Sequence, residues 1–269
     1  MRAILPITYI TFKEGIRHRI LYGTLLVAVF MIFLAVILSS LFMRDTAKVM
    51  IDICLATINI GGLLVPFIVA VNLLARDIET RTIYSVLSQA ISRGHYVIGR
   101  FLGIALITLI VMLILLSATI IAVLIAGQMF PAFFRNYSLA PTLVSTICSF
   151  LGIITLNSTV LLWCSITTSS FLATLLVLTT YVIGHSVQDL IRFMQVQAEL
   201  VEISPIIQYT LQFVHYVFPN LAAFDFKQLA AHSINIPLNE VGFLLFYALS
   251  YISLMLVAST LIFHRRDFS

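Results

Sequence analysis

Five polar side chains stand inside long apolar segments of this 269-residue chain. They are Asn59, Asn72, Asn157, His185 and Asp189. Polar groups are costly to bury in a bilayer, so each is a candidate pathway or polar membrane residue. His185 and Asp189 share a helix face at a spacing of four, which suits a hydrogen-bonded pair or part of a cation site. The more ordinary interpretation is a pair facing headgroups or external segments near the end of a span, and we predict no metal site.

Other motifs for chemistry are missing from the sequence. It contains neither HExxH nor paired intramembrane carboxylates, which argues against an intramembrane hydrolase. It also lacks the GxxxxGK[ST] loop that cradles nucleotide phosphates. We therefore expect this chain not to be an enzyme and to bind no cofactor itself. Cys54, Cys148 and Cys164 lie within or at the edge of apolar segments without ligand spacing, which predicts buried residues.

The elements that must position these residues are six apolar segments, each long enough for a membrane-spanning helix of about 20 residues. They cover roughly residues 21–43, 53–75, 101–126, 143–166, 171–191 and 241–263. Hydrophobic residues make up 61% of the chain and charged residues 10%, a composition far from that of soluble domains. We predict an all-α polytopic membrane protein with six transmembrane helices in a single transmembrane domain, residues 1–269.

Two local features should shape the spans. Pro66 should kink the second span, because proline removes a backbone donor. Gly99 and Gly103 form a GxxxG pattern at the start of the third span, which would permit close helix approach. Only TTSS separates the fourth and fifth spans, so these two should be adjacent and antiparallel.

Charge distribution predicts the orientation. Placing the N-terminus inside assigns most lysines and arginines to the cytoplasm and most acids to the outside, as the positive-inside rule requires. Both termini are then cytoplasmic. The net charge of +4 fits this inside excess and an attraction to anionic lipid, and gives no reason to expect nucleic acid as a partner.

Two further segments flank the spans. Residues 1–20 place Tyr9, Phe12, Ile16 and Ile20 at helical spacing among basic residues, which predicts an N-terminal interfacial helix. A topology anchor and a mechanical role are both open for it. Residues 192–240 are external, long and apolar, and we expect short external helices there before span six, dipping into the outer leaflet or capping the spans.

The charged stretch LLARDIETRTIYSVLSQAISRGHYVIGRFLG, residues 73–103, interrupts the apolar chain between spans two and three. Its apolar residues recur at steps of three and four, which predicts a short amphipathic cytoplasmic helix with Gly94 as its stop after Arg93. Such a helix is a natural docking surface for a partner. The alternative is an interfacial loop that only obeys the positive-inside rule.

This stretch resembles the signature region of permease subunits in the type 2 exporter superfamily of ABC transporters, which includes drug, sodium, polysaccharide and copper-enzyme-maturation permeases. In that region an acid-rich helix end, a Gly-Thr step, an LLSxPISR core and a YxxGK exit form the loop that contacts the ATPase. Residues in matching places are Glu79, Thr82, Leu87, Ser88, Ile91, Ser92, Arg93, Tyr96 and Gly99. The chain departs from the pattern at Arg81, Ala90 and Arg100, where glycine, proline and lysine are usual. FKEGIRHR, FPNLAAFD and the terminal FHRRDF extend the resemblance along the chain.

The resemblance implies a coupling helix from Glu79 to Arg93, in a cytoplasmic coupling region at residues 76–100 between spans two and three. It also implies a connecting helix from Tyr9 to Ile20. The implied contacts with the ATPase subunit are Glu79, Arg81, Thr82, Tyr84, Leu87, Ser88, Gln89, Ile91, Ser92 and Arg93. The connecting helix would use Phe12, Lys13, Ile16 and Arg17. The implied partners are two copies of a cytoplasmic P-loop ATP-binding subunit carrying ATP and Mg, a second permease subunit (homodimer or paralogous heterodimer) and membrane lipid. The implied location is the bacterial plasma (inner) membrane.

Our leading hypothesis is the transmembrane subunit of an ATP-binding-cassette exporter, with spans two and five lining a path. Hydrolysis in separate cytoplasmic subunits would move a substrate out of the cytoplasm or the inner leaflet. One alternative is a membrane scaffold or mechanotransmitter driven by a partner ATPase, with residues 192–240 as its working surface. Another is an ATP-independent channel or carrier. No residue selects a substrate.

Overall fold

A computed structural model of the chain describes residues 4–17, 20–41, 46–71, 92–135, 137–197 and 205–265. This part is all-helical, as predicted, and contains no strand. The elements are α1 (Ile4–Arg17), α2 (Ile20–Leu41), α3 (Thr46–Leu64), the π-helix η1 (Val65–Ala70), α6 (Arg93–Met129), α7 (Pro131–Phe134), α8 (Leu139–Ile166), α9 (Ser170–Gln197), α10 (Pro205–Val217), the 3-10 helix η2 (Ala222–Phe224), α11 (Lys227–Ala231) and α12 (Leu238–Arg265).

Five helical stretches in the described part are long and apolar enough to cross a membrane, which makes this a multi-pass membrane protein. They are Thr46–Ile68, Arg93–Met129, Leu139–Ile166, Ser170–Met194 and Leu238–Arg265. The first predicted span falls on α2, a 22-residue helix without a charged side chain. Six crossings therefore remain a prediction. Cys54, Cys148 and Cys164 are buried, as expected.

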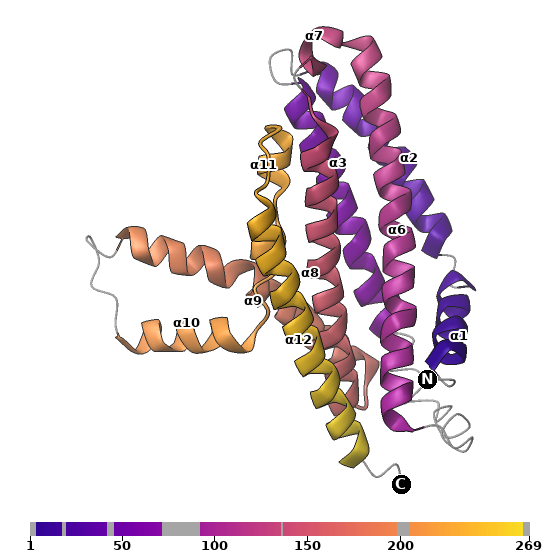
Figure 1. Ribbon diagram of the computed structural model, residues 1–269, viewed down its shortest axis with the longest axis vertical. Coiled ribbons are helices and arrows are strands. Elements are labelled where there is room, and N and C mark those ends of the chain that lie inside the picture. Colours follow the sequence, from indigo (N-terminus) through magenta and orange to yellow (C-terminus); the bar gives the residue numbers. More distant parts are fainter. Residues whose placement is uncertain are drawn as a thin grey trace.

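The spans form an elongated bundle with α8 near its centre (Figure 1). α8 packs against α3, α6, α9 and α12, and α2 packs against α3 and α6. α1 and the C-terminal end of α12 lie together at one end of the bundle, which we call the terminal end (Figure 1). The other end, which carries α7, is the opposite end. Since α1 and the C-terminal end of α12 lie at one end, the described helices fit an orientation that places both on one side of a membrane.

α6 begins earlier than the sequence suggested. Ser92 is its N-cap, with a side-chain oxygen that accepts a hydrogen bond from the backbone N–H of His95 at 3.4 Å. The helix then runs unbroken through Gly94. The prediction of a helix stop at Gly94 is therefore wrong, because the serine cap starts a new helix at the same place.

α1 packs along the first turns of α6, where it contacts the two glycines of the GxxxG pattern. A Cβ on Gly99 would lie 2.8 Å from Ile7 Cβ, and one on Gly103 would lie 2.5 Å from Thr11 Cβ. The Thr8 hydroxyl also donates to the Gly99 carbonyl at 3.2 Å. Close helix approach at this pattern is thus confirmed, with α1 as the partner.

The face of α1 that packs on α6 differs from the apolar stripe in the sequence. Its buried residues are Ile7, Thr8, Thr11 and Gly15. Tyr9 is 64% exposed, whereas Phe12 packs partly against the core. Small and hydroxyl-bearing residues face the neighbouring helix because they allow close contact. The bulky apolar side chains of α1 are therefore left largely exposed on its other faces.

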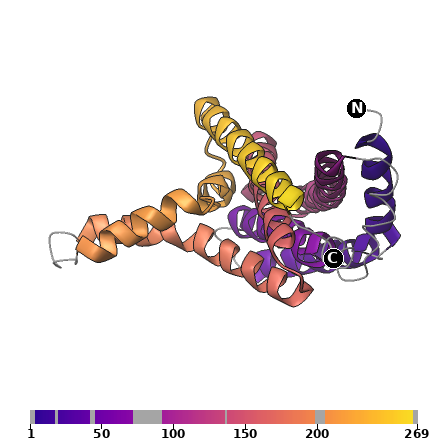
Figure 2. The same ribbon diagram turned by 90° about the horizontal axis from the view of Figure 1, so that it is seen from below.

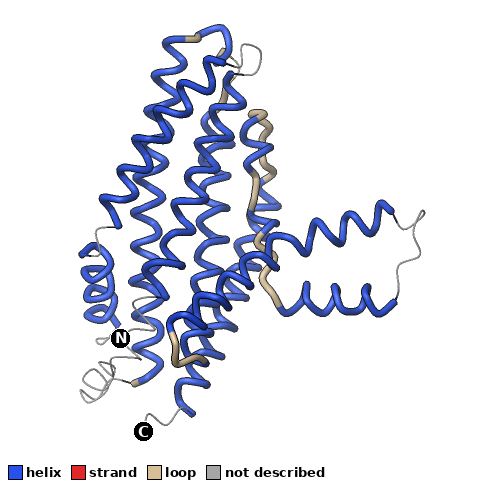
Figure 3. The backbone as a smooth tube through the Cα atoms, turned by 180° about the vertical axis from the view of Figure 1, so that it is seen from behind, coloured by secondary structure: helices blue, strands red, loops and turns tan. Residues whose placement is uncertain are grey.

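α9 leans away from the bundle, and its C-terminal half forms an arm with α10 that projects sideways (Figures 1 and 2). The chain returns from the arm as a loop-rich segment, residues 218–237, that runs beside α12 toward the opposite end (Figure 3). This segment contains η2 and α11 and packs against α3 and α8. Residues 205–240 thus contain the short helices expected before the last predicted span.

A methyl group at Gly103 should weaken the packing of α1. We expect Gly103→Ala to cost about 1–3 kcal/mol of stability, because overpacking must displace Thr11. Gly127→Ala is the matched control in the same helix, since its Cβ would meet Phe134 only at an ordinary 3.9 Å. Thermal unfolding in detergent measures both. Equal melting temperatures for the two variants would contradict the close contact.

Candidate functional site

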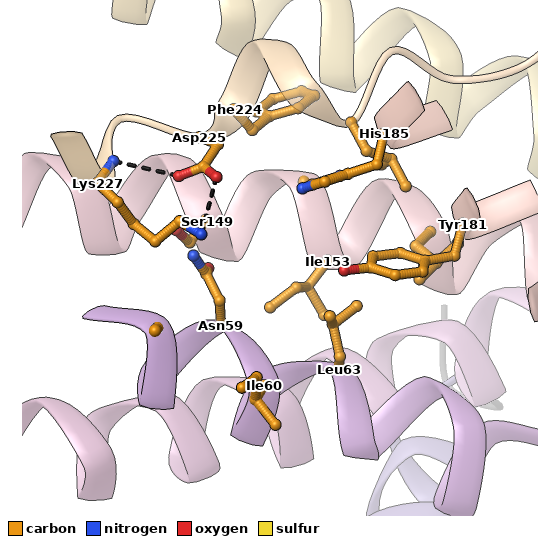
Figure 4. Close-up of a pocket in the computed structure, with 14 residues that line it drawn as sticks. Asn59, Ile60, Leu63, Ser149, Ile153, Tyr181, His185, Phe224, Asp225 and Lys227 are labelled. Atoms are coloured by element: carbon orange, nitrogen blue, oxygen red, sulfur yellow. Dashed lines mark hydrogen bonds and ion pairs between the residues drawn. The ribbon is translucent and has the colours of Figure 1, made fainter. Parts of the chain in front are cut away.

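A cavity of about 130 Å³ lies between α3, α8, α9 and the returning segment 218–237. We call it the inner cavity. Asn59, Ser149 and Lys227 line one end with polar groups, and Leu63 and Ile153 line the other with apolar ones (Figure 4). The cavity therefore offers one polar and one apolar surface to the same occupant.

The polar end is shaped by a turn that follows η2. Asp225 accepts a hydrogen bond from the Lys227 backbone N–H at 3.1 Å and forms an ion pair with Lys227 Nζ at 3.0 Å. Phe224, only 2% exposed, anchors this turn against α8. The Tyr247 hydroxyl holds the preceding residues by accepting from the Asn220 N–H at 2.9 Å. These two contacts hold the chain just before Asp225 and so position the ion pair at the cavity wall.

His185 points a ring nitrogen into the inner cavity (Figure 4). The ring stacks on Tyr181 with centroids 5.2 Å apart, and its Nδ1 atom is buried without a hydrogen-bond partner. No hydrogen bond or ion pair joins the described side chains of His185 and Asp189. The predicted pair therefore does not form here, although both side chains reach one site.

A larger chamber of about 780 Å³ adjoins the inner cavity, and we call it the vestibule. His185, Asp225 and Lys227 line both chambers. The charged residues of the vestibule wall are Asp52, Asp189, Arg192, Asp225, Lys227 and Glu240. Four carboxylates against two basic groups make its potential negative at neutral pH.

The candidate polar residues therefore separate into groups. Asn59 and His185 meet in the inner cavity, and Asp189 lines the vestibule. Asn157 is fully buried elsewhere and donates from Nδ2 to the Thr108 hydroxyl at 3.1 Å, which joins α8 to α6. Asn72 lies outside the described residues.

Several residues of this site were not singled out from the sequence, among them Ser149, Tyr181, Asp225 and Lys227. Ser149 and Tyr181 sit in apolar spans without a distinguishing pattern. Asp225 and Lys227 stand in and just after FPNLAAFD, so this quoted motif was the available signal. Its sequence does not reveal that the segment folds back onto α8.

A second candidate site lies at the terminal end, where the charged stretch joins α6. Residues 72–91 lie outside the described part, and this includes the implied ATPase contacts from Glu79 to Ile91. Arg93 donates from Nη1 to the carbonyls of Phe263 and His264 at 2.7 and 3.0 Å. A cation thus binds carbonyls at the C-terminal end of α12, where the helix dipole favours it.

A second arginine, Arg100, connects α6 to α1 at the same end and is only 5% exposed. Its Nη1 donates to Glu14 at 2.6 Å and to the Thr11 hydroxyl at 3.2 Å, and its Nε donates to the Tyr96 hydroxyl at 3.3 Å. A buried guanidinium is tolerated because these acceptors satisfy it. Of the implied connecting-helix residues, Lys13, Ile16 and Arg17 are exposed on α1. We call the contacts made by Arg93 and Arg100 the terminal-end junction.

Comparison with known proteins does not identify a family. No protein-family model matches the chain, and no curated protein matches it either. The function must therefore be argued from the residues and their arrangement.

A methyl group at Gly184 should lift the returning segment from α9. The Gly184 carbonyl accepts from the Leu221 N–H at 3.0 Å, and a Cβ at Gly184 would lie 2.5 Å from the Pro219 carbonyl oxygen. We expect Gly184→Ala to speed amide exchange at Leu221 by about fivefold or more, the equivalent of one net hydrogen bond of about 1 kcal/mol. Hydrogen-exchange mass spectrometry measures this. Gly242→Ala, with nothing within 4 Å, is the control, and rapid exchange across 218–237 in the unmodified protein would contradict an ordered segment.

Proposed function

We propose that this chain is the transmembrane subunit of an ATP-binding-cassette exporter of the type 2 superfamily, in a bacterial inner membrane with both termini cytoplasmic. ATP and Mg would be bound by two copies of a separate cytoplasmic subunit. The charged stretch at residues 76–92 would be the surface that receives that subunit's motion. The proposal rests on the sequence resemblance and on the arrangement around this stretch.

The terminal-end junction is the observation that carries the proposal. The stretch ends at the Ser92 cap of α6, and the next residue, Arg93, contacts α12. Two turns later Arg100 ties α6 to Glu14 of α1. A displacement of the stretch would therefore reach α1, α6 and α12 together. Such linkage suits a device that converts movement of a cytoplasmic partner into movement of membrane helices.

The inner cavity supports a transport path. Its walls come from α3 and α9, on the predicted spans two and five, with α8 between them. Transporters and their substrates commonly meet at polar groups within the membrane-spanning region. In this proposal the cavity belongs to the substrate path, and the vestibule is its outlet at the opposite end.

The arm gives one specific observation in favour of a second permease subunit, and also of the scaffold alternative. Its α10 exposes Ile206, Tyr209, Phe213 and Tyr216, each at least 69% exposed. Exposed apolar surface of this kind marks either a partner or lipid. If the arm instead binds a protein complex outside the membrane, the chain would transmit force to that complex without moving a substrate. Transport measured in sealed vesicles separates these functions, because only the exporter moves a solute.

Mutation of the charged stretch should remove the ATPase partner. We expect the chain, expressed with its neighbouring genes and gently extracted, to co-purify with a P-loop ATPase. Glu79→Arg with Ser88→Trp should abolish this association without reducing membrane insertion. Arg135→Glu, exposed at the opposite end, is the matched control. Mass spectrometry of the purified material measures the result. A chain that purifies alone, or an association that survives the double variant, would remove the docking role.

A cysteine on the arm should cross-link two permease subunits. The native cysteines are all buried, so Tyr216→Cys, at an 83% exposed position, introduces an accessible thiol. We expect a disulfide or short-linker dimer of this chain, or a cross-link to a paralogous permease, on mild oxidation in membranes. Leu254→Cys on the exposed face of α12 is the control and should give little product. Equal cross-linking at both positions would indicate random collision and contradict an arm-mediated contact.

A further inference from the structure

We infer that the inner cavity and the vestibule form one binding site for a small amphipathic amine. The apolar part of the ligand would fill the apolar end of the inner cavity. Its protonated amine would lie where the two chambers meet, beside His185. The inference concerns this chain alone and stands whether or not an ATPase partner exists.

The apolar end sets the size of the ligand. Leu63, Ile153, Leu156 and the Tyr181 ring line this part of the 130 Å³ cavity. An apolar cavity of roughly 150 Å³ in another protein holds one benzene ring, so the inner cavity as a whole has about the size of one phenyl or short alkyl group. The acyl chains of a two-chain lipid are too large to enter, so such a lipid could reach the site only with its headgroup.

His185 supplies an unused hydrogen-bonding group at the boundary. Its Nδ1 atom is buried without a partner, and a neutral imidazole nitrogen accepts a hydrogen bond from an N–H group. The Tyr181 ring that stacks on it lines the same cavity, and an aromatic ring attracts a cation within about 6 Å of its centroid. An ammonium group at this boundary would satisfy the histidine.

The charge of the vestibule selects a cation. Lys227 is already paired with Asp225, so Asp52, Asp189 and Glu240 outnumber the remaining base, Arg192. A negative chamber raises the local concentration of cations and disfavours carboxylates. Among the described residues no group of three or more His, Cys, Asp or Glu is placed to hold a metal ion. An organic ammonium therefore fits this chamber better than a divalent metal.

Binding of matched probes to the purified full chain tests the inference. Calorimetry in phosphatidylcholine nanodiscs would compare 2-phenylethylamine with its neutral counterpart 2-phenylethanol and the anion 3-phenylpropionate. We expect the amine to bind at least about tenfold more tightly than the alcohol, since charge-assisted contacts are the stronger ones. The anion should not bind. Equal affinity for the amine and the alcohol, or preference for the anion, would overturn the inference.

Two variants locate the site. Leu63→Trp fills the apolar end, and His185→Ala removes the unused acceptor. Each should weaken amine binding at least about tenfold. Two exposed positions serve as controls and should bind the amine normally. They are Ile147→Trp on α8, where Ile147 is 54% exposed, and His232→Ala at the end of α11. If Leu63→Trp does not fold, His185→Ala carries the test. Unchanged affinity in His185→Ala would place the amine elsewhere and overturn the inference.

The amine could be a soluble molecule or a lipid headgroup, and the nanodisc composition distinguishes them. Phosphatidylethanolamine added to the discs should leave 2-phenylethylamine binding unchanged if the natural ligand is soluble. Competition by the lipid would support the ammonium site and assign its source to the headgroup. Because these measurements use no ATPase, their failure leaves the proposed exporter assembly untouched, and loss of co-purification leaves the ligand site untouched.

Discussion

Close helix approach at small residues is the constraint on which this bundle depends. Lipid tails are as apolar as leucine, so helices in a membrane associate through tight packing and hydrogen bonds rather than through the hydrophobic effect. Gly99 and Gly103 let α1 lie directly on α6, and Gly152 receives Phe224 with a Cβ separation of only 3.0 Å. The first contact assembles the terminal-end junction. The second holds the returning segment on α8 and so closes the inner cavity.

Polar groups in this bundle follow the same logic. Arg100 is buried because Glu14, Thr11 and Tyr96 surround it with acceptors. Asn157 uses its amide to join two helices, whereas His185 keeps a buried nitrogen unpaired. Asn157 Oδ1 also lacks a partner, but this residue is fully buried, whereas His185 lines both chambers and can offer its unpaired nitrogen to a ligand. Position at a cavity wall, and not residue type, therefore separates packing from site.

Local pattern predicted much of the fold and only part of the site. Apolar length alone placed the span at 143–166 within α8, because twenty apolar residues in a row suit a bilayer helix wherever they occur. The packing face of α1 was not predictable in this way, since its partner is some ninety residues distant. Asn59 and Asn157 look alike in the sequence, yet one lines a cavity and the other joins helices. Long-range packing decides these cases.

α3 and η1 connect the inner cavity with the charged stretch. Asn59 and Leu63 belong to the cavity wall, and Val71 is the last described residue before the stretch. Between them Pro66 lacks the N–H that an α-helix needs, and the six residues of η1 adopt π-helix instead.

η1 also touches the other cavity wall, because Phe67 contacts Tyr181 edge to face with centroids 6.2 Å apart. The Arg93 and Arg100 contacts tie the start of α6 to α12 and α1. In the proposed exporter, a displacement of the charged stretch would therefore reach α3 through η1, the π-helix that follows it. Movement of the α3 wall relative to α6 and α8 is the change this arrangement favours, and it would alter the inner cavity, which Asn59 and His185 both line.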